Sequence, residues 1–139
     1  MMKDKWDDLQ EKLQENVLEE YSEQLKKEFL NPENIGKIEN LDSWTRITGV
    51  CGDTVEIYLS VEKGMIKDIK FGTDGCGFTI SCCSYLTRTV KGKSLEAYQI
   101  KPEEIDEYFG GLPEENKHCA KLAVITLRAA IEKYRNLTF

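Results

Sequence analysis

The sequence predicts an α+β fold: a three-stranded antiparallel sheet with helices packed on one face and a long N-terminal helix. Two observations carry this prediction. Residues 54–61 alternate polar with apolar side chains, which is typical of a strand with one buried face. From residue 77 onward the apolar residues recur every three or four positions, which is the period of an α-helix. The length of 139 residues suits one domain with a real core.

Three neighbouring segments are expected to form the sheet, at residues 43–50, 54–61 and 65–72. A tight turn over residues 51–53 joins the first two segments. A hairpin turn at Lys63-Gly64 joins the second and third, because Gly64 can adopt a positive φ. The product is an antiparallel meander.

Helices are expected over residues 77–90, briefly from Ser94, from Pro102, and over residues 114–134. The first ends at Lys91-Gly92-Lys93, as glycine and lysine favour helix C-termini. The apolar stripe of the last helix should press on the sheet. The sequence has no internal repeat, so we expect residues 31–139 to form a single domain.

An amphipathic pattern precedes this domain. Large apolar residues recur at helical spacing over residues 3–29, so we expect residues 1–30 to form a helical extension that ends at Asn31-Pro32. The extension packs either on its own domain or on another chain. Its apolar face comprises Trp6, Leu9, Leu13, Val17, Tyr21, Leu25 and Phe29.

Composition excludes several classes of function. The net charge is −6 and the basic residues are scattered, which argues against nucleic-acid binding. No apolar run approaches the roughly 18 residues of a membrane span, and the polar, acidic N-terminus is unlike a signal peptide. The count of five cysteines is odd, which indicates a reducing compartment and metal or thiol chemistry. We therefore expect a cytoplasmic protein.

Cys76 lies between Gly75 and Gly77, where a strand ends and a helix begins. The two glycines allow a sharp turn, and the unpaired N–H groups of the helix start favour a thiolate. We therefore expect the pKa of Cys76 to lie below the usual value of about 8.5. The alternative is a buried cysteine beside a turn.

Two other cysteines also lie at junctions. Cys51 is in the turn between the first two strands, two residues before Asp53, and Cys119 follows His118 in the first turn of the last helix. If the junctions meet, they offer three thiolates, a carboxylate and an imidazole, which suits zinc or an iron–sulfur cluster. Cys119 could equally belong to the core, and His118 could be a solvated residue at a helix start.

The remaining two cysteines lie in the helix that follows Cys76. Cys83 falls on the apolar stripe of that helix and is expected in the core. Cys82 points away from the stripe, so it is expected either to be exposed or to lie near the site as an auxiliary thiol.

The combined motifs resemble the IscU family, the NifU N-terminal type of iron–sulfur scaffold. The resemblance runs in unbroken order from about Tyr21 to Tyr134. It implies the same α+β fold, and a scaffold role in place of an enzyme with turnover. The motifs are Cys51-Gly52-Asp53, Gly75-Cys76-Gly77 and His118-Cys119, supported by Asn31-Pro32-Glu33-Asn34, Lys91-Gly92-Lys93-Ser94 and Leu112-Pro113.

The resemblance also implies a site and its cargo. Cys51, Cys76, Cys119 and Asp53 would hold a transient [2Fe–2S] cluster, with His118 as the other candidate ligand. Cys119, acidified by its helix start, is the candidate persulfide acceptor. The alternative is a zinc-bound sulfur acceptor that builds no cluster.

Implied partners are a cysteine desulfurase of the IscS/NifS type and apo iron–sulfur acceptor proteins, with a ferredoxin or a frataxin-like protein as further candidates. We also expect a homodimer in the cluster-bound form. The family's Leu-Pro-Pro-Val-Lys chaperone motif is replaced here by Leu-Pro-Glu-Glu-Asn over residues 112–116, which argues against chaperone docking.

Overall fold

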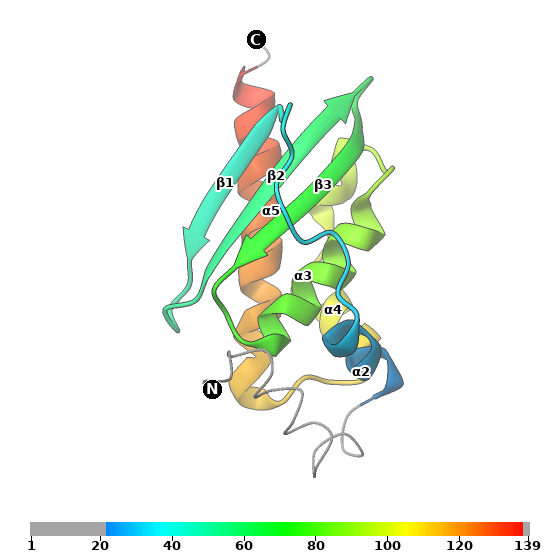
Figure 1. The fold of residues 1–139 in the computed structure, drawn as a ribbon, viewed down its shortest axis with the longest axis vertical. Coiled ribbons are helices and arrows are strands. Elements are labelled where there is room, and N and C mark those ends of the chain that lie inside the picture. The colour runs from blue at the N-terminus through cyan, green and yellow to red at the C-terminus, as the bar shows by residue number, and fades with distance from the viewer. Residues whose placement is uncertain (1–21, 138–139) are drawn as a thin grey trace, which may run out of the picture.

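The computed structural model describes residues 22–137 and has the expected α+β architecture (Figure 1). Its antiparallel sheet has the order β1-β2-β3, formed by β1 (Ser43–Thr48), β2 (Thr54–Glu62) and β3 (Met65–Thr73). Of the predicted N-terminal helix, the structure describes α2 (Glu23–Leu30). The rest of that prediction lies outside the described residues, and the domain boundary at residue 30 stays a prediction.

The central strand shows why the sheet forms. Val55, Ile57 and Leu59 of β2 are fully buried, as their alternation with polar residues predicts. Ile57 pairs with Thr45 of β1 and with Phe71 of β3. The meander therefore presents one continuous apolar face to the helices.

Two helices cover that face (Figure 1). Helix α5 (Lys117–Leu137) contacts β1 and β2, while α3 (Gly77–Val90) contacts β3 and α5. The short elements between them are η3 (Leu95–Gln99), α4 (Pro102–Tyr108) and η4 (Glu114–Asn116), the two η segments being 3₁₀ turns. No described helix is long and apolar enough to cross a membrane. The largest fully buried side chains are Leu25, Phe29, Ile57, Leu59, Ile66, Ile69, Phe71, Leu86, Ile105, Phe109, Leu127 and Ile131.

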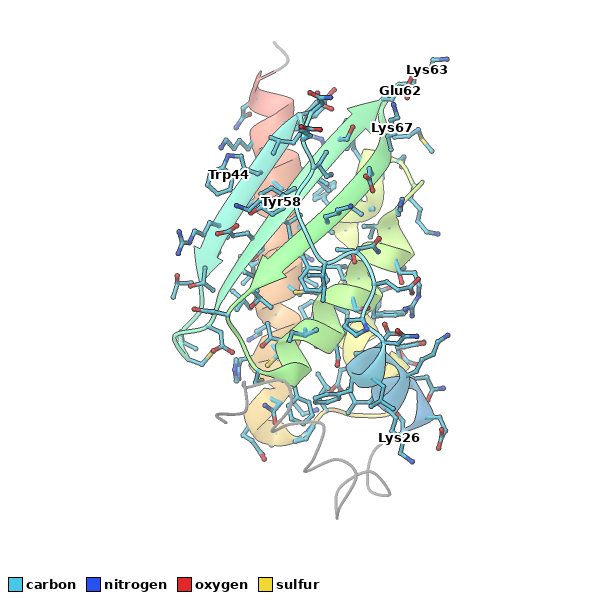
Figure 2. The ribbon with its side chains drawn as sticks, in the orientation of Figure 1. Lys26, Trp44, Tyr58, Glu62, Lys63 and Lys67 are labelled. Atoms are coloured by element: carbon cyan, nitrogen blue, oxygen red, sulfur yellow. The ribbon has the colours of Figure 1, made fainter. Side chains whose placement is uncertain are left out.

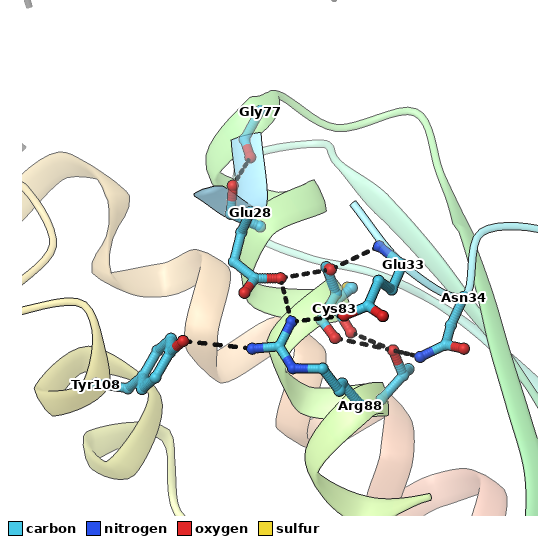
Figure 3. A network of polar contacts seen from close by, with 10 residues as sticks. Glu28, Glu33, Asn34, Gly77, Cys83, Arg88 and Tyr108 are labelled. Carbon is cyan, nitrogen blue, oxygen red and sulfur yellow. Dashed lines mark hydrogen bonds and ion pairs between the residues drawn. The ribbon is translucent and has the colours of Figure 1, made fainter. Parts of the chain in front are cut away.

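A charged network fixes α2 to α3 (Figure 3). The Arg88 guanidinium donates to the buried carboxylate of Glu28 at 2.7 Å and to Glu33 at 2.9 Å. The Ser84 hydroxyl donates to the same Glu28 oxygen at 2.7 Å. A buried carboxylate is costly without such partners, so the network holds α2 in one position.

Phe29 of α2 packs directly on the first turn of α3. Its ring meets Phe78 edge-to-face, with centroids 5.2 Å apart. A Cβ atom added at Gly77 would lie 1.9 Å from the Phe29 ring, so only glycine permits this approach. Helix α2 therefore presses on the residues that follow Cys76.

The two ends of the sheet differ. Figure 2 shows Glu62, Lys63 and Lys67 at the tip of the β2–β3 hairpin, at the far end of the molecule from Lys26 on α2. Both Lys63 and Gly64 adopt positive φ at that tip, as a tight hairpin turn requires. The β1–β2 turn and the starts of α3 and α5 lie at the opposite end from this tip (Figure 1).

Candidate metal centre

Three chain junctions meet at this end of the sheet. The β1–β2 turn is closed by the Gly49 amide, which donates to the Asp53 carbonyl at 2.8 Å, and Gly52 adopts a φ of 92° within it. Cys76 precedes α3 as its N-cap residue, and His118 and Cys119 lie in the first turn of α5. The fold thus brings together all five side chains that the sequence singles out.

The outer part of the site is formed by Cys51, Asp53 and His118. One potential ligand atom from each side chain lies within 4.8 Å of the other two. Cys51 is exposed, and the other two residues are half-buried. Sulfur, oxygen and nitrogen donors at this spacing suit zinc or iron.

The inner part is formed by Cys76 and Cys119, whose sulfurs lie 3.8 Å and 3.2 Å from the hydroxyl of Thr79. The pKa of Cys76 falls to about 5, chiefly because the Cys119 thiol donates to it and because the amides of Phe78 and Thr79 point at its sulfur. Its predicted acidity is therefore confirmed. The imidazole of His118 joins the two parts, since its Nε2 lies 3.7 Å from the Cys119 sulfur.

The expectation that the helix start acidifies Cys119 is wrong. The pKa of Cys119 is raised, first because its thiol proton is shared with Cys76 and then because the side chain is fully buried. Two adjacent thiols cannot both ionise cheaply. The half-buried Cys76 takes the charge, and Cys119 keeps the proton.

A residue that the sequence analysis did not single out lies between the two parts. The hydroxyl of Thr79 is 3.2 Å from Oδ2 of Asp53 and 3.2 Å from the sulfur of Cys119. It is also 3.8 Å from the sulfur of Cys76. Thr79 lies three residues after Cys76, and this one-turn spacing was the available signal.

Gly75 is required by the same close packing. A Cβ atom at Gly75 would lie 2.9 Å from Oδ2 of Asp53 and 2.9 Å from Cβ of Thr79. Any larger residue would push the carboxylate outward. Gly75 therefore permits both the sharp turn before Cys76 and the close packing of the Asp53 carboxylate.

The two remaining cysteines are both fully buried in α3. The prediction of Cys83 as a core residue is confirmed. Of the two alternatives for Cys82, exposure is wrong, because the structure packs α2, α5 and β3 around α3. A role as an auxiliary thiol near the site stays a prediction. Burial, together with the nearby Cys83 and Cys76 sulfurs, raises the pKa of Cys82.

Comparison with known proteins identifies relatives over most of the chain. The family model described as the NifU-like N terminal domain matches residues 20–139. The chain is 42% identical over 116 residues to the "Iron-sulfur cluster assembly scaffold protein IscU 1" of Archaeoglobus fulgidus, spanning 82% of this chain and 76% of the relative. It is 38% identical over 122 residues to the Escherichia coli "Iron-sulfur cluster assembly scaffold protein IscU", spanning 84% and 94%.

Solved structures share the fold. A NifU-like protein (N-terminal) from Brucella abortus superposes with a TM-score of 0.67 at 16% identity, covering 83% of this chain and 94% of that one. A putative iron–sulfur cluster assembly scaffold protein for the SUF system from Fervidobacterium islandicum superposes with a TM-score of 0.65 at 24% identity, covering 80% and 96%. At these identities the likeness shows the fold alone.

Proposed function

The chain belongs to the NifU-like N-terminal domain family, and we propose that it is a scaffold on which iron–sulfur clusters are assembled. The cluster is cargo, built from iron and desulfurase-derived sulfur and then transferred to apoproteins. The role is assembly, without catalytic turnover. One observation carries the proposal: three cysteine sulfurs, a carboxylate and an imidazole meet at one end of the sheet.

We assign the cargo, a [2Fe–2S] cluster, to the sulfurs of Cys51, Cys76 and Cys119. Asp53 or His118 supplies the fourth ligand. Four thiolates would bind the metal tightly, whereas an oxygen or imidazole ligand in place of one thiolate forms a weaker bond. This mixed set therefore suits a cluster that must later be released.

Sulfur transfer to the scaffold is a thiol exchange with no net oxidation. A scaffold thiolate attacks the terminal sulfur of the persulfide on a cysteine desulfurase of the IscS/NifS type. A new S–S bond forms, the old one breaks, and the desulfurase cysteine leaves as a thiolate. Cys119 is fully buried, so sulfur that ends there arrives through the more open Cys76 or Cys51.

An apolar hollow of about 260 Å³ adjoins the site and suits a protein partner. It lies between the β1–β2 turn and α5, next to His118, and Val50 at its rim is fully exposed. We assign this face to the desulfurase, and the apo acceptors, a ferredoxin or a frataxin-like protein would approach the same end. The exposed Glu114 and Glu115 replace the family's chaperone motif, so we expect no chaperone docking.

Anaerobic reconstitution with ferrous iron, cysteine and a cysteine desulfurase tests the proposal. The wild-type chain should develop a [2Fe–2S] absorption spectrum and transfer the cluster to an apo-ferredoxin. Cys51→Ala, Cys76→Ala and Cys119→Ala should each abolish the stable cluster and retain the helical circular dichroism. The matched control is Cys83→Ala, which should keep the cluster and lose roughly 1 kcal/mol of stability. A normal chromophore in Cys76→Ala would overturn the ligand assignment.

A second candidate is a zinc-bound sulfur acceptor that builds no cluster. The outer group of Cys51, Asp53 and His118 favours it, because mixed sulfur, oxygen and nitrogen donors bind zinc readily. This candidate predicts that the reconstituted chain carries persulfide and zinc but gains no iron–sulfur absorption. The same reconstitution therefore separates the two functions.

A further inference from the structure

Thr79 places a buried hydroxyl at the centre of the proposed site. Its side chain is fully buried in the first turn of α3. The hydroxyl lies 3.2 Å from Asp53 Oδ2, 3.2 Å from the Cys119 sulfur and 3.8 Å from the Cys76 sulfur. One side chain thus links the β1–β2 turn, α3 and α5.

This hydroxyl is used differently from three comparable ones. Buried serine and threonine residues in helices commonly donate to the carbonyl one turn earlier. Thr79 is instead directed to a carboxylate and a thiol on other elements. Three other buried hydroxyl residues donate back to their own helix: Ser81 to Gly77, Thr87 to Cys83, and Thr126 to Leu122. Ser84 instead donates to Glu28 of α2, within the network that fixes α2 to α3.

The hydroxyl carries a single hydrogen, so it can donate to only one of its neighbours at a time. Of the two acceptors at 3.2 Å, the Asp53 carboxylate is stronger than the protonated Cys119 thiol, because hydrogen bonds to charged groups are the stronger ones. The sulfur of Cys76 lies farther away, at 3.8 Å. Donation to Asp53 occupies Oδ2, the same oxygen that packs against the Gly75 backbone. The other oxygen, Oδ1, takes no part in this hydrogen bond.

We propose that Thr79 is a positioning residue that holds Asp53 in place, so that the carboxylate offers a single oxygen to the metal. The inference rests on the proposed function, in which Asp53 is a candidate ligand. Groups that hydrogen-bond to a ligand fix its orientation, and their loss typically lowers metal affinity by about 10- to 100-fold. Thr79 therefore controls how firmly Asp53 engages the cargo.

Co²⁺ binding to the apo protein tests this inference independently of cluster assembly. Thr79→Val removes the hydroxyl at nearly constant volume and should weaken Co²⁺ binding roughly tenfold. Thr79→Ser keeps the hydroxyl and should restore the affinity. The matched control is Thr126→Val, which removes a buried helix hydroxyl that bonds only its own helix and should leave Co²⁺ affinity unchanged.

A double-mutant cycle with Asp53→Ala shows whether Thr79 acts through the carboxylate. The Thr79→Val effect should vanish in the Asp53→Ala background, because coupled residues are not additive. A tenfold loss that persists without the carboxylate would overturn the inference and place the effect on Cys119 or on packing. Circular dichroism of each variant detects misfolding. Thr79→Ser is the milder change and is expected to fold even if Thr79→Val does not.

Cluster lifetime gives the second readout. Asp53→Ala should lengthen the lifetime and slow transfer to an apo-ferredoxin, and Thr79→Val should shift both in the same direction. If Thr79 and Asp53 are coupled in Co²⁺ binding but the wild-type chain forms no cluster, the scaffold function is refuted and the role of Thr79 stands. If the wild-type chain forms a normal cluster but Thr79 and Asp53 are not coupled in Co²⁺ binding, only the role of Thr79 is refuted.

Discussion

Cys76 and Cys119 show how one neighbour decides the chemistry of a residue. Each lies at the start of a helix, so the sequence predicts two acidic thiols. In the fold the two thiols interact, which lowers the pKa of Cys76 and raises that of Cys119. A contact between residues 43 positions apart in the chain cannot be read from local sequence, so only the first pKa was predictable.

The pH dependence of Cys76 alkylation tests this shared proton. Because its pKa is lowered to about 5, Cys76 is a thiolate throughout neutral pH, and its iodoacetamide rate should stay constant there. The rate should fall as the pH drops through about 5, where the thiolate takes a proton. In Cys119→Ala the donor is gone, so the midpoint should rise toward the ordinary value of about 8.5. Peptide mass spectrometry of the labelled apo protein follows Cys76 alone, and an unchanged midpoint in Cys119→Ala would contradict the shared proton.

Asp53 and Thr79 differ in how clearly the sequence indicates their roles. Asp53 stands in a recognisable turn motif with Cys51, so it was predictable as a site residue. Thr79 is one threonine in the first turn of a helix, a position where such residues are ordinary. Its importance comes from two partners on distant elements, 26 and 40 residues away.

Hydrophobic periodicity predicted the helices and strands that have one buried and one exposed face. The alternation in β2 and the apolar stripe of α3 gave their boundaries closely. The last helix starts at Lys117, three residues later than expected, because residues 114–116 form a 3₁₀ turn after Pro113. Cys82 is buried although it lies off the apolar stripe, because α2, α5 and β3 all pack against α3. A stripe on one side of the helix does not reveal this enclosure.

Gly77→Ala tests the contact between α2 and the helix that carries Cys76. The new methyl group would lie 1.9 Å from the Phe29 ring, so α2 must shift, at a cost of about 1–3 kcal/mol. Urea denaturation should show this loss. Gly72→Ala is the matched control, because nothing lies within 4 Å of its added Cβ atom. Equal stabilities of the two variants would mean that α2 does not press on α3 as described.

At the scale of the whole molecule, the fold gathers its reactive groups at one end. The hairpin tip at the other end carries charged residues such as Glu62, Lys63 and Lys67 (Figure 2). The fold class followed from the sequence, because buried residues recur at every second position in the strands and at every third or fourth in the helices. The meeting of the junctions was only one alternative there, because spacing along the chain does not determine which turns lie together. Residues 1–21 lie outside the described structure, so any prediction about them rests on the sequence alone.

We predict that the cluster-bound form is a homodimer and that the N-terminal segment contributes to the contact. Trp6, Leu9, Leu13 and Val17 share one predicted helical face, and leaving each in water forfeits roughly 1.5–3 kcal/mol. Light scattering of the intact chain and of a variant lacking residues 1–20, each with and without cluster, measures the mass. The deletion should convert the cluster-bound dimer to a monomer. A monomer in the intact, cluster-bound chain would contradict the prediction, and an unchanged dimer after the deletion would exclude the segment as the contact.

We infer that this chain assembles an iron–sulfur cluster on a mixed ligand set. The Mössbauer spectrum of the chain, purified anaerobically after reconstitution with iron-57 and a desulfurase, is the decisive measurement. We predict two quadrupole doublets of equal area from a coupled [2Fe–2S] pair, because one iron has only sulfur ligands and the other also binds Asp53 or His118. A spectrum containing only mononuclear ferrous iron, with zinc in the protein, would contradict the claim.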